Sequence, residues 1–219
     1  IVFTGLGVPI AFCITLVGAV GMALVTDIEF VLITFQSLPY ATASEYAFAV
    51  IPMFVLMGAL ASSAGIISEL YTAVNRWLEG VRGGFYIATA VASAGFAAIS
   101  GSTVVNAAMF TRIALPEMLA LGYHKGISAG CIAAAGTFAA LIPPSLTFVI
   151  FGILTGESIG ELFIAGIIPG LMTAALYVIM IPIMLKVRPD WAPNIKIQST
   201  FAQKLRGMTG IWPMLLLVL

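Results

Sequence analysis

The sequence predicts an all-α polytopic membrane protein, and three observations carry this prediction. Of its 219 residues, 61% are hydrophobic and only 8% are charged, whereas about 25% of the residues of a soluble domain are charged. Several apolar runs reach the roughly 20 residues that a membrane-spanning helix needs. These runs are continuous, unlike the short alternating segments of a β-barrel. A water-soluble globular fold is therefore excluded.

The charged and reactive residues exclude two function classes. Nine Lys and Arg balance nine Asp and Glu, so the chain has no basic surface to neutralise nucleic-acid phosphates. The one histidine, His124, has no HExxH motif around it, and Cys13 and Cys131 lie in apolar runs without a CxxC motif. The side chains that catalysis inside a membrane needs are missing. We therefore predict a protein that is not an enzyme and does not bind nucleic acid.

Charged residues divide the first part of the chain into segments. Residues 1–26 are uncharged and predict a first span, and a short apolar stretch follows that ends near Pro39. Residues 46–68 predict a second span. Residues 69–82 carry four charged side chains among apolar ones at helical spacing. This pattern predicts an amphipathic helix that lies along the membrane interface.

Two further uncharged runs contain helix breakers. The first covers residues 83–111, with the sequence SGSTVVN at 100–106 in its middle. The second covers residues 126–156, with Pro143 and Pro144 near its centre. Proline removes a backbone N–H and restricts the residue before it. We therefore expect a broken helix in 126–156 and an interruption in 83–111.

Apolar spans and a charged segment alternate again in the last part of the chain. Residues 157–185 hold a further span at 162–185, residues 186–206 form a linker with five basic residues and one acid, and residues 207–219 begin another span. Because the chain opens and closes inside apolar runs, we interpret it as a fragment of a longer protein.

The distribution of Lys and Arg predicts the topology. If residues 83–111 form a re-entrant hairpin, all nine basic residues fall on one side of the membrane, the side that the positive-inside rule assigns to the cytoplasm. A single crossing would separate Arg76 and Arg82 from the others. We therefore predict a hairpin entered from the cytoplasm and a cytoplasmic N-terminus.

The two interruptions predict a binding site. Backbone that is not helical at membrane depth must be buried in protein or line a wet cavity. The carbonyl ends of half-helices suit Na⁺, and their N-termini attract carboxylates. Gly and Ser can also serve helix packing, and Pro can simply kink a span, so a purely structural role is the alternative.

The motifs resemble those of a known family, the large membrane subunit of tripartite ATP-independent periplasmic (TRAP) transporters. The resemblance covers nearly the whole chain and rests on five segments: GVPIAF (7–12), AVIPMFVLMGAL (49–60), SGSTVVNAAMFTRIALPEMLALGY (100–123), AAGTFAALIPPS (134–145) and TGESIGELFIAGIIPG (155–170). The family's large subunit has two inverted halves, each with a hairpin and a broken helix, and moves as an elevator. This chain resembles the first half.

The resemblance implies a sodium-driven importer of small organic acids, such as C4-dicarboxylates or sialic acid, in a bacterial inner membrane. It implies a small four-helix membrane subunit and a periplasmic solute-binding protein as partners, sodium as the coupling ion and no other cofactor. It divides the chain into a scaffold (1–82) and a transport element (83–156) made of the hairpin 83–120 and the broken helix 126–156.

The resemblance also implies site residues. Sodium would be bound by Ser100, Gly101, Ser102, Thr103, Gly136, Thr137, Pro143 and Pro144. Asn106 and Ser145 lie close to these positions in the sequence motifs, and we expect them to contact the substrate.

Two alternatives remain beside the TRAP-type subunit. A stand-alone sodium/dicarboxylate symporter of similar architecture would need no binding protein, and neighbouring genes would distinguish the two. A channel would line its pore with charged rings or carbonyl loops from symmetric subunits, and no charged residue lies in the middle of a predicted span here.

Overall fold

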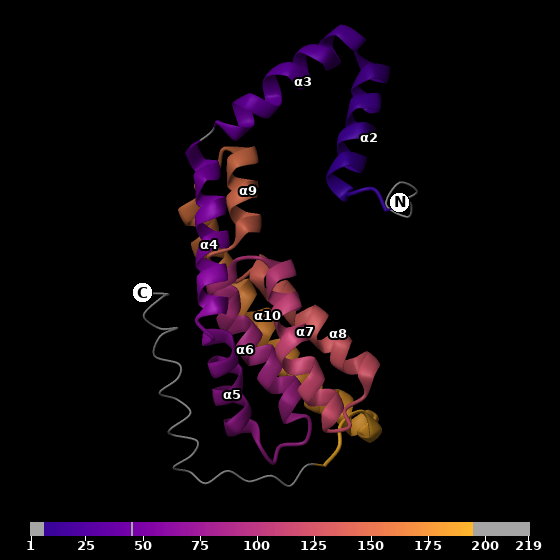
Figure 1. Cartoon of the computed structure of the whole chain (residues 1–219), viewed down its shortest axis with the longest axis vertical. Helices are drawn as coiled ribbons and strands as arrows, with labels where there is room; N and C mark the ends of the chain where they lie inside the picture. The colour runs from indigo at the N-terminus through magenta and orange to yellow at the C-terminus, as the bar shows by residue number, and fades with distance from the viewer. Residues whose placement is uncertain (1–6, 45, 195–219) are drawn as a thin grey trace. The chain divides into compact units, whose positions relative to one another are not determined.

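The computed structural model describes residues 7–44 and 46–194, and these residues form nine α-helices, three short 3₁₀ helices and no strand (Figure 1). The predicted all-α class is confirmed. The predictions for residues 1–6, for most of the linker 186–206 and for the next span at 207–219 lie outside the described residues. The chain forms two compact units that divide between Ala49 and Val50.

The first unit consists of α2 (Ile10–Val25), α3 (Ile28–Ala43) and the 3₁₀ helix η1 (Tyr46–Ala49). Helix α3 does not stop near Pro39, as the sequence suggests, but continues through it to Ala43. A proline removes only one helical hydrogen bond and often kinks a helix without ending it. The Thr34 hydroxyl donates to the Phe30 carbonyl at 2.7 Å, so this polar side chain is satisfied within its own helix.

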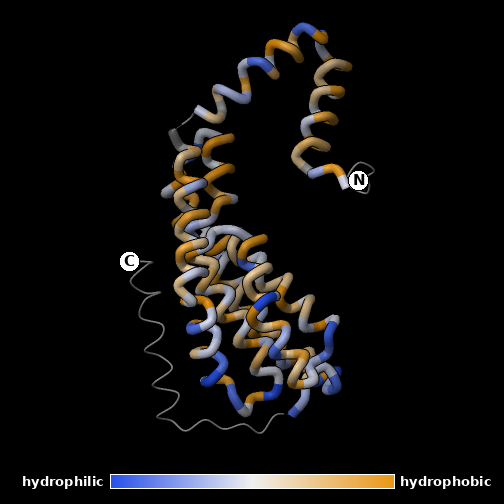
Figure 2. Tube along the Cα trace, viewed as in Figure 1, coloured by the Kyte–Doolittle hydropathy of each residue, from blue (hydrophilic) through white to orange (hydrophobic). Residues whose placement is uncertain are grey.

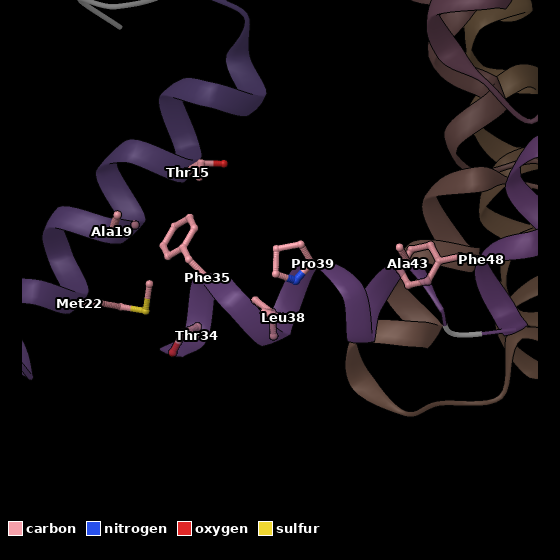
Figure 3. Close-up of a pocket in the computed structure, with 10 residues that line it drawn as sticks. Thr15, Ala19, Met22, Thr34, Phe35, Leu38, Pro39, Ala43 and Phe48 are labelled. Atoms are coloured by element: carbon pink, nitrogen blue, oxygen red, sulfur yellow. The ribbon is translucent and has the colours of Figure 1, made fainter. Parts of the chain in front are cut away.

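A pocket of about 510 Å³ lies between α2 and α3, and its lining is almost entirely apolar (Figure 3). Phe35, Leu38 and Pro39 of α3 face Ala19 and Met22 of α2 in this view. Both helices also expose large apolar side chains, among them Phe12 of α2 and Leu32 of α3. Exposed apolar surface of this extent is typical of contact with lipid or with another protein.

The second unit begins with α4 (Val50–Ser63) and α5 (Ile66–Leu78), whose axes differ by 62°. Both elements differ from the predicted bounds 46–68 and 69–82. Gly65 adopts φ 76° between them, and a residue in this left-handed conformation commonly terminates a helix. Helix α5 is amphipathic as predicted, since it buries Ile67 and Tyr71 on one face.

Helices α6 (Gly84–Ser100) and α7 (Thr103–Ala120) form a helical hairpin that turns at residues 101–102. Helix α6 lies at the centre of the second unit, in contact with α4, α5, α7, α8 and α10. Its approach to α5 is close, since a Cβ on Gly84 would lie 2.3 Å from the Leu78 carbonyl oxygen. The chain is therefore interrupted and reverses its direction within residues 83–120, and the re-entrant position of this hairpin in a membrane stays a prediction.

Residues 126–156 are also interrupted in the structure. Helix α8 (Lys125–Gly136) passes into the 3₁₀ helix η2 (Thr137–Ala140), and α9 (Leu146–Thr155) starts only after Ser145. Helix α10 (Ile159–Val187) follows, and the 3₁₀ helix η3 (Pro189–Trp191) lies at its end.

Hydrogen bonds tie the start of the linker to the base of the hairpin. The Arg82 guanidinium donates to the Pro189 carbonyl at 2.7 Å, the Tyr86 hydroxyl to the Trp191 carbonyl at 2.9 Å, and the His124 backbone N–H to the same carbonyl at 3.2 Å. Figure 2 shows hydrophilic residues gathered at this end of the second unit, where α5 and α7 end. The two ends of the hairpin and the end of α10 therefore lie on one side of the unit.

Among the described residues, α10 is the one helix long and apolar enough by itself to cross a membrane, and α4 with α5 would form a second if the bent pair is one span. Helices α2, α3, α6 and α9 are apolar but shorter. Helix α10 exposes large apolar side chains, among them Ile164 and Val187. Its outer surface is suited to lipid or to another apolar protein surface.

Candidate functional site

The hairpin tip is built from the end of α6 and the start of α7. Gly101 adopts φ 56°, and its N–H donates to the Ala97 carbonyl at 3.0 Å, which closes the last turn of α6. Ser102 is extended and begins α7, where its hydroxyl accepts the Val105 N–H at 3.5 Å. Thr103 is the first residue of α7 and is half-buried.

Ser100 differs from the other hydroxyl residues of the tip. Its side chain is buried, and its Oγ has no hydrogen-bond partner. Gly58 of α4 lies against this residue, since a Cβ on Gly58 would be 3.6 Å from the Ser100 Cα. A buried hydroxyl usually finds a partner, so the tip contains an oxygen that is free to accept a ligand.

The break after α8 is closed by Ser145. Its hydroxyl donates to the Ala140 carbonyl at 2.9 Å and accepts the Thr147 N–H at 3.2 Å, so it joins the end of η2 to the start of α9. Pro143 and Pro144 form the turn between them, and the bond that joins the two prolines is cis. Thr137 is exposed, and its hydroxyl donates to the Ala134 carbonyl at 2.6 Å.

The tip and the break touch each other. The Leu146 N–H donates to the Gly101 carbonyl at 3.0 Å. A Cβ on Gly101 would lie 2.9 Å from the Pro144 carbonyl oxygen and 3.6 Å from the Ser145 Cα. The structure therefore brings the predicted site residue Gly101 together with two others, Pro144 and Ser145, from a distant part of the sequence.

A second contact joins α7 to α8 beside the break. A Cβ on Gly136 would lie 2.8 Å from the Ala107 Cβ, so only a glycine fits there without a shift of one helix. The 3₁₀ helix that carries Thr137 packs against both α6 and α7. The predicted residues Gly136 and Thr137 are thus held against the hairpin.

Asn106 is fully buried between the hairpin helices. The Ser93 hydroxyl lies 3.0 Å from the Asn106 Oδ1 and 2.9 Å from the Ala135 carbonyl oxygen, and the Asn106 Nδ2 donates to the Ser93 carbonyl at 3.1 Å. In this structure the amide of Asn106 is thus used to join α6 to α7. Substrate contact by Asn106 stays a prediction.

Ser93 is a residue that sequence reasoning missed. Its hydroxyl connects α6, α7 and the end of α8 at one buried point. The signal in the sequence is weak: Thr89 and Ser93 are both polar, lie four residues apart in an apolar run and therefore share one face of a helix. Both are completely buried.

The site is electrically neutral and built from hydroxyls, backbone carbonyls and helix ends. Residues 83–111 and 126–156 contain no charged residue. Within the described ranges, no group of three or more His, Cys, Asp or Glu is placed to hold a metal ion. A cation at this site would therefore be bound by neutral oxygens.

The comparison with known proteins identifies the family. The family model described as "Tripartite ATP-independent periplasmic transporter, DctM component" matches residues 1–219. The chain belongs to this family. The resemblance noted from its motifs is confirmed.

Curated relatives support the same assignment. The chain is 33% identical over 180 residues to the C4-dicarboxylate TRAP transporter large permease protein DctM of Pseudomonas aeruginosa, covering 82% of this chain and 42% of the relative. It is 35% identical over 170 residues to the 2,3-diketo-L-gulonate TRAP transporter large permease protein YiaN of Escherichia coli, covering 78% and 40%. It is 37% identical over 138 residues to the ectoine TRAP transporter large permease protein TeaC of Halomonas elongata, covering 63% and 32%.

The chain spans about two-fifths of the length of the first two DctM relatives that it matches, 42% and 40%. These relatives are membrane transporter permeases and not enzymes, so the family function is transport. The names of the three relatives described above give different substrates, namely C4-dicarboxylates, 2,3-diketo-L-gulonate and ectoine.

Proposed function

We propose that this chain is the first half of the permease subunit of a sodium-coupled secondary transporter that imports small organic acids. A periplasmic binding protein would deliver the substrate, and a small four-helix membrane subunit would complete the complex in the bacterial inner membrane. Family membership supports the proposal, and so does an isethionate relative from Oleidesulfovibrio alaskensis that is named as a permease protein DctMQ. Neighbouring genes for a secreted binding protein and a small membrane protein would support the same partners.

One observation carries the proposal: the hydrogen bond from the Leu146 N–H to the Gly101 carbonyl, which joins the two helix interruptions. Around it, α6 ends at Ser100, α7 begins at Thr103 and α9 begins at Leu146. The N-termini of α7 and α9 carry partial positive charge and attract carboxylates, and the carbonyl end of α6 favours a cation. One neutral site thus offers groups for both sodium and an organic anion.

The proposed mechanism is an elevator motion in which the transport element 83–156 slides against the scaffold 1–82. Gly58 of α4 lies directly against Ser100 of the tip, and small residues allow helices to approach closely. The hairpin and the broken helix pack together through α6, α7, α8 and η2. Such packing is required if the two are to move as one rigid body.

The topology can be tested by cysteine labelling of the intact permease. Single cysteines in place of Glu79, Lys125 or Lys196 are expected to react with an impermeant thiol reagent only from the cytoplasmic side. Glu79 and Lys125 flank the hairpin at its two ends, so the re-entrant arrangement requires both on the same side. Reaction of the Glu79 position from outside and of Lys125 from inside would contradict it.

Sodium coupling can be tested at Ser102 and Thr137. Both hydroxyls lie beside helix ends and keep lone pairs that can accept a cation. Replacing either by Ala is expected to raise the sodium concentration for half-maximal uptake about fivefold, because one polar contact is worth about 1 kcal/mol. Thr155→Ala, an exposed hydroxyl at the end of α9, is the matched control. Uptake that ignores sodium and follows a proton gradient would contradict the assignment.

A further inference from the structure

Residues 188–192, which follow α10 directly, lie against the open end of the hairpin, where α6 begins and the chain leaves α7. We call this segment the strap. The Trp191 N–H donates to the Arg188 carbonyl at 3.4 Å, which closes the strap into a turn. Pro189 lies inside it and Pro193 follows it, and a proline has no N–H with which to continue a helix. The carbonyls of the strap are therefore left as acceptors for other parts of the chain.

Arg82 binds the strap at both of its ends. Its guanidinium donates to the Pro189 carbonyl at 2.7 Å and to the Ala192 carbonyl at 3.4 Å. A guanidinium is planar and presents several donors in a fixed arrangement, so one side chain can hold two carbonyls three residues apart. Ala192 is completely buried, so this end of the strap is packed into the second unit.

The Trp191 carbonyl, between these two, accepts from both sides of the hairpin. The Tyr86 hydroxyl donates to it at 2.9 Å from the first turn of α6, and the His124 N–H donates at 3.2 Å from the chain that follows α7. A carbonyl oxygen has two lone pairs, so it can serve both donors. The Tyr86 and Tyr123 rings pack edge to face at 4.9 Å beside these bonds. The strap therefore joins the start of α6 to the segment after α7.

The turn that carries Arg82 has little freedom. Gly83 adopts φ 75°, and a Cβ there would overlap the side chain of Leu185 near the end of α10. The Gly84 N–H donates to the Val81 carbonyl at 2.9 Å, which closes the turn around Arg82. Arg82 is thus fixed beside the end of α10, where the strap begins.

We propose that Arg82 and Tyr86 are positioning residues that hold the strap as one unit across the open end of the hairpin, and so fix the angle between α6 and α7. Groups in one hydrogen-bond network depend on each other, so loss of one donor loosens the whole strap. Both helices lead to the tip, and a change of their angle at the open end moves the tip. Arg82 and the strap then move with the hairpin and not with the scaffold, a consequence that rests on the proposed function.

Hydrogen–deuterium exchange of the intact permease in lipid nanodiscs tests the proposal, with the His124 amide as the reporter. Arg82→Ala leaves the acceptor of this amide, the Trp191 carbonyl, without a direct change. It is nevertheless expected to raise the exchange rate of the His124 amide about fivefold or more, because local opening of the strap exposes it. Tyr86→Phe, which removes only a hydroxyl, is expected to do the same. Arg82→Lys keeps the charge and one donor and should raise the rate less.

Arg112→Ala and Tyr40→Phe are the matched controls, because both side chains are exposed and neither residue belongs to the strap or its donors. They should leave the exchange rate of the His124 amide unchanged. An unchanged rate in Arg82→Ala as well would overturn the proposal.

The Glu157 amide, bonded to the Gly152 carbonyl at 3.1 Å, reports on the rest of the second unit. Its exchange rate should stay the same in every variant. If Arg82→Ala raises it as much as that of His124, the whole fold is loosened, and the milder Tyr86→Phe then decides. Equal rises at both amides in Tyr86→Phe would overturn the proposal.

Uptake tests the role of the strap in transport. Arg82→Ala is expected to lower the maximal rate of uptake about threefold or more and to leave the KM unchanged, because Arg82 lies outside the proposed substrate site. Unchanged uptake together with faster exchange at His124 would overturn the role of the strap in fixing the hairpin. The exchange measurement does not depend on transport, so its failure is distinct from failure of the proposed function.

Discussion

Gly101→Ala is expected to reduce substrate uptake by the intact permease at least tenfold, about 1.4 kcal/mol. Gly101 adopts φ 56°, a conformation that costs an alanine roughly 1–2 kcal/mol. The added Cβ would also lie 2.9 Å from the Pro144 carbonyl oxygen. That contact is to backbone, which cannot rotate away as a side chain can. The tip and the break must therefore separate, and the hydrogen bond from Leu146 to Gly101 is lost or lengthened.

Two other glycines separate the causes of this loss. Gly122 also has a positive φ, 84°, but a Cβ there meets no atom within 4 Å. Gly130 on α8 has neither a positive φ nor a neighbour within 4 Å. Initial rates of uptake and the amount of folded protein are compared for all three alanine variants. Gly130→Ala should match the original, and Gly122→Ala should lose some stability but keep its uptake. Equal uptake by the Gly101 and Gly122 variants would show that contact between tip and break is not needed.

The interruptions could be predicted from the sequence because their causes are local. Gly101 supplies a left-handed conformation, Ser102 and Ser145 cap the helices that follow them, and Pro143 and Pro144 cannot continue a helix. Each of these effects depends on one residue and its immediate neighbours. The helix ends at Ser100 and Gly136 and the helix starts at Thr103 and Leu146 therefore lie at the motifs that interrupt the two runs.

The bend after α4 could not be predicted from the sequence, because it depends on contacts that are not local. Gly65 follows Ser62 and Ser63 inside an apolar run, and hydropathy alone extends the span across them to residue 68. The structure ends α4 at Ser63, because Gly65 turns the chain and α5 buries its own apolar face. Which face of a helix is buried depends on its neighbours in three dimensions, and one apolar run does not contain that information.

Contacts between distant segments could not be predicted either. Ser93 and Asn106 lie on different helices of the hairpin, and the bond from Leu146 to Gly101 joins the broken helix to the hairpin tip. The motifs predict which residues interrupt the helices. They do not predict that Asn106 points into the helix contact, with its amide bonded to Ser93.

Asn106→Ala is expected to lower the free energy of unfolding of the permease by about 1–3 kcal/mol, the cost of leaving a buried polar group without its partner. The change removes the donor to the Ser93 carbonyl and one of the two acceptors near the Ser93 hydroxyl. Both residues are completely buried, so water cannot replace the lost bonds. Unfolding of the purified protein by heat or denaturant measures the loss.

A double-mutant cycle assigns this loss to the pair. Ser93→Ala, Asn106→Ala and the double variant are expected to give a coupling energy of about 0.5–3 kcal/mol, as residues in one hydrogen-bond network do. Thr111→Ala is the control, because its hydroxyl is exposed and bonded only to the Ala107 carbonyl of its own helix. It should change stability by less than about 0.5 kcal/mol. If the single losses add without coupling, Ser93 and Asn106 do not stabilise each other.

The same variant distinguishes packing by Asn106 from substrate contact. A residue that binds substrate but does not stabilise the fold would raise the KM for uptake when it is replaced, and the free energy of unfolding would stay the same. Replacing a residue that joins α6 to α7 would lower the free energy of unfolding, and the permease that remains folded would keep its KM for uptake. Because the amide is bonded to Ser93 at 3.0 and 3.1 Å, we expect the second result for Asn106→Ala. A raised KM for uptake with an unchanged free energy of unfolding would instead indicate that Asn106 contacts the substrate.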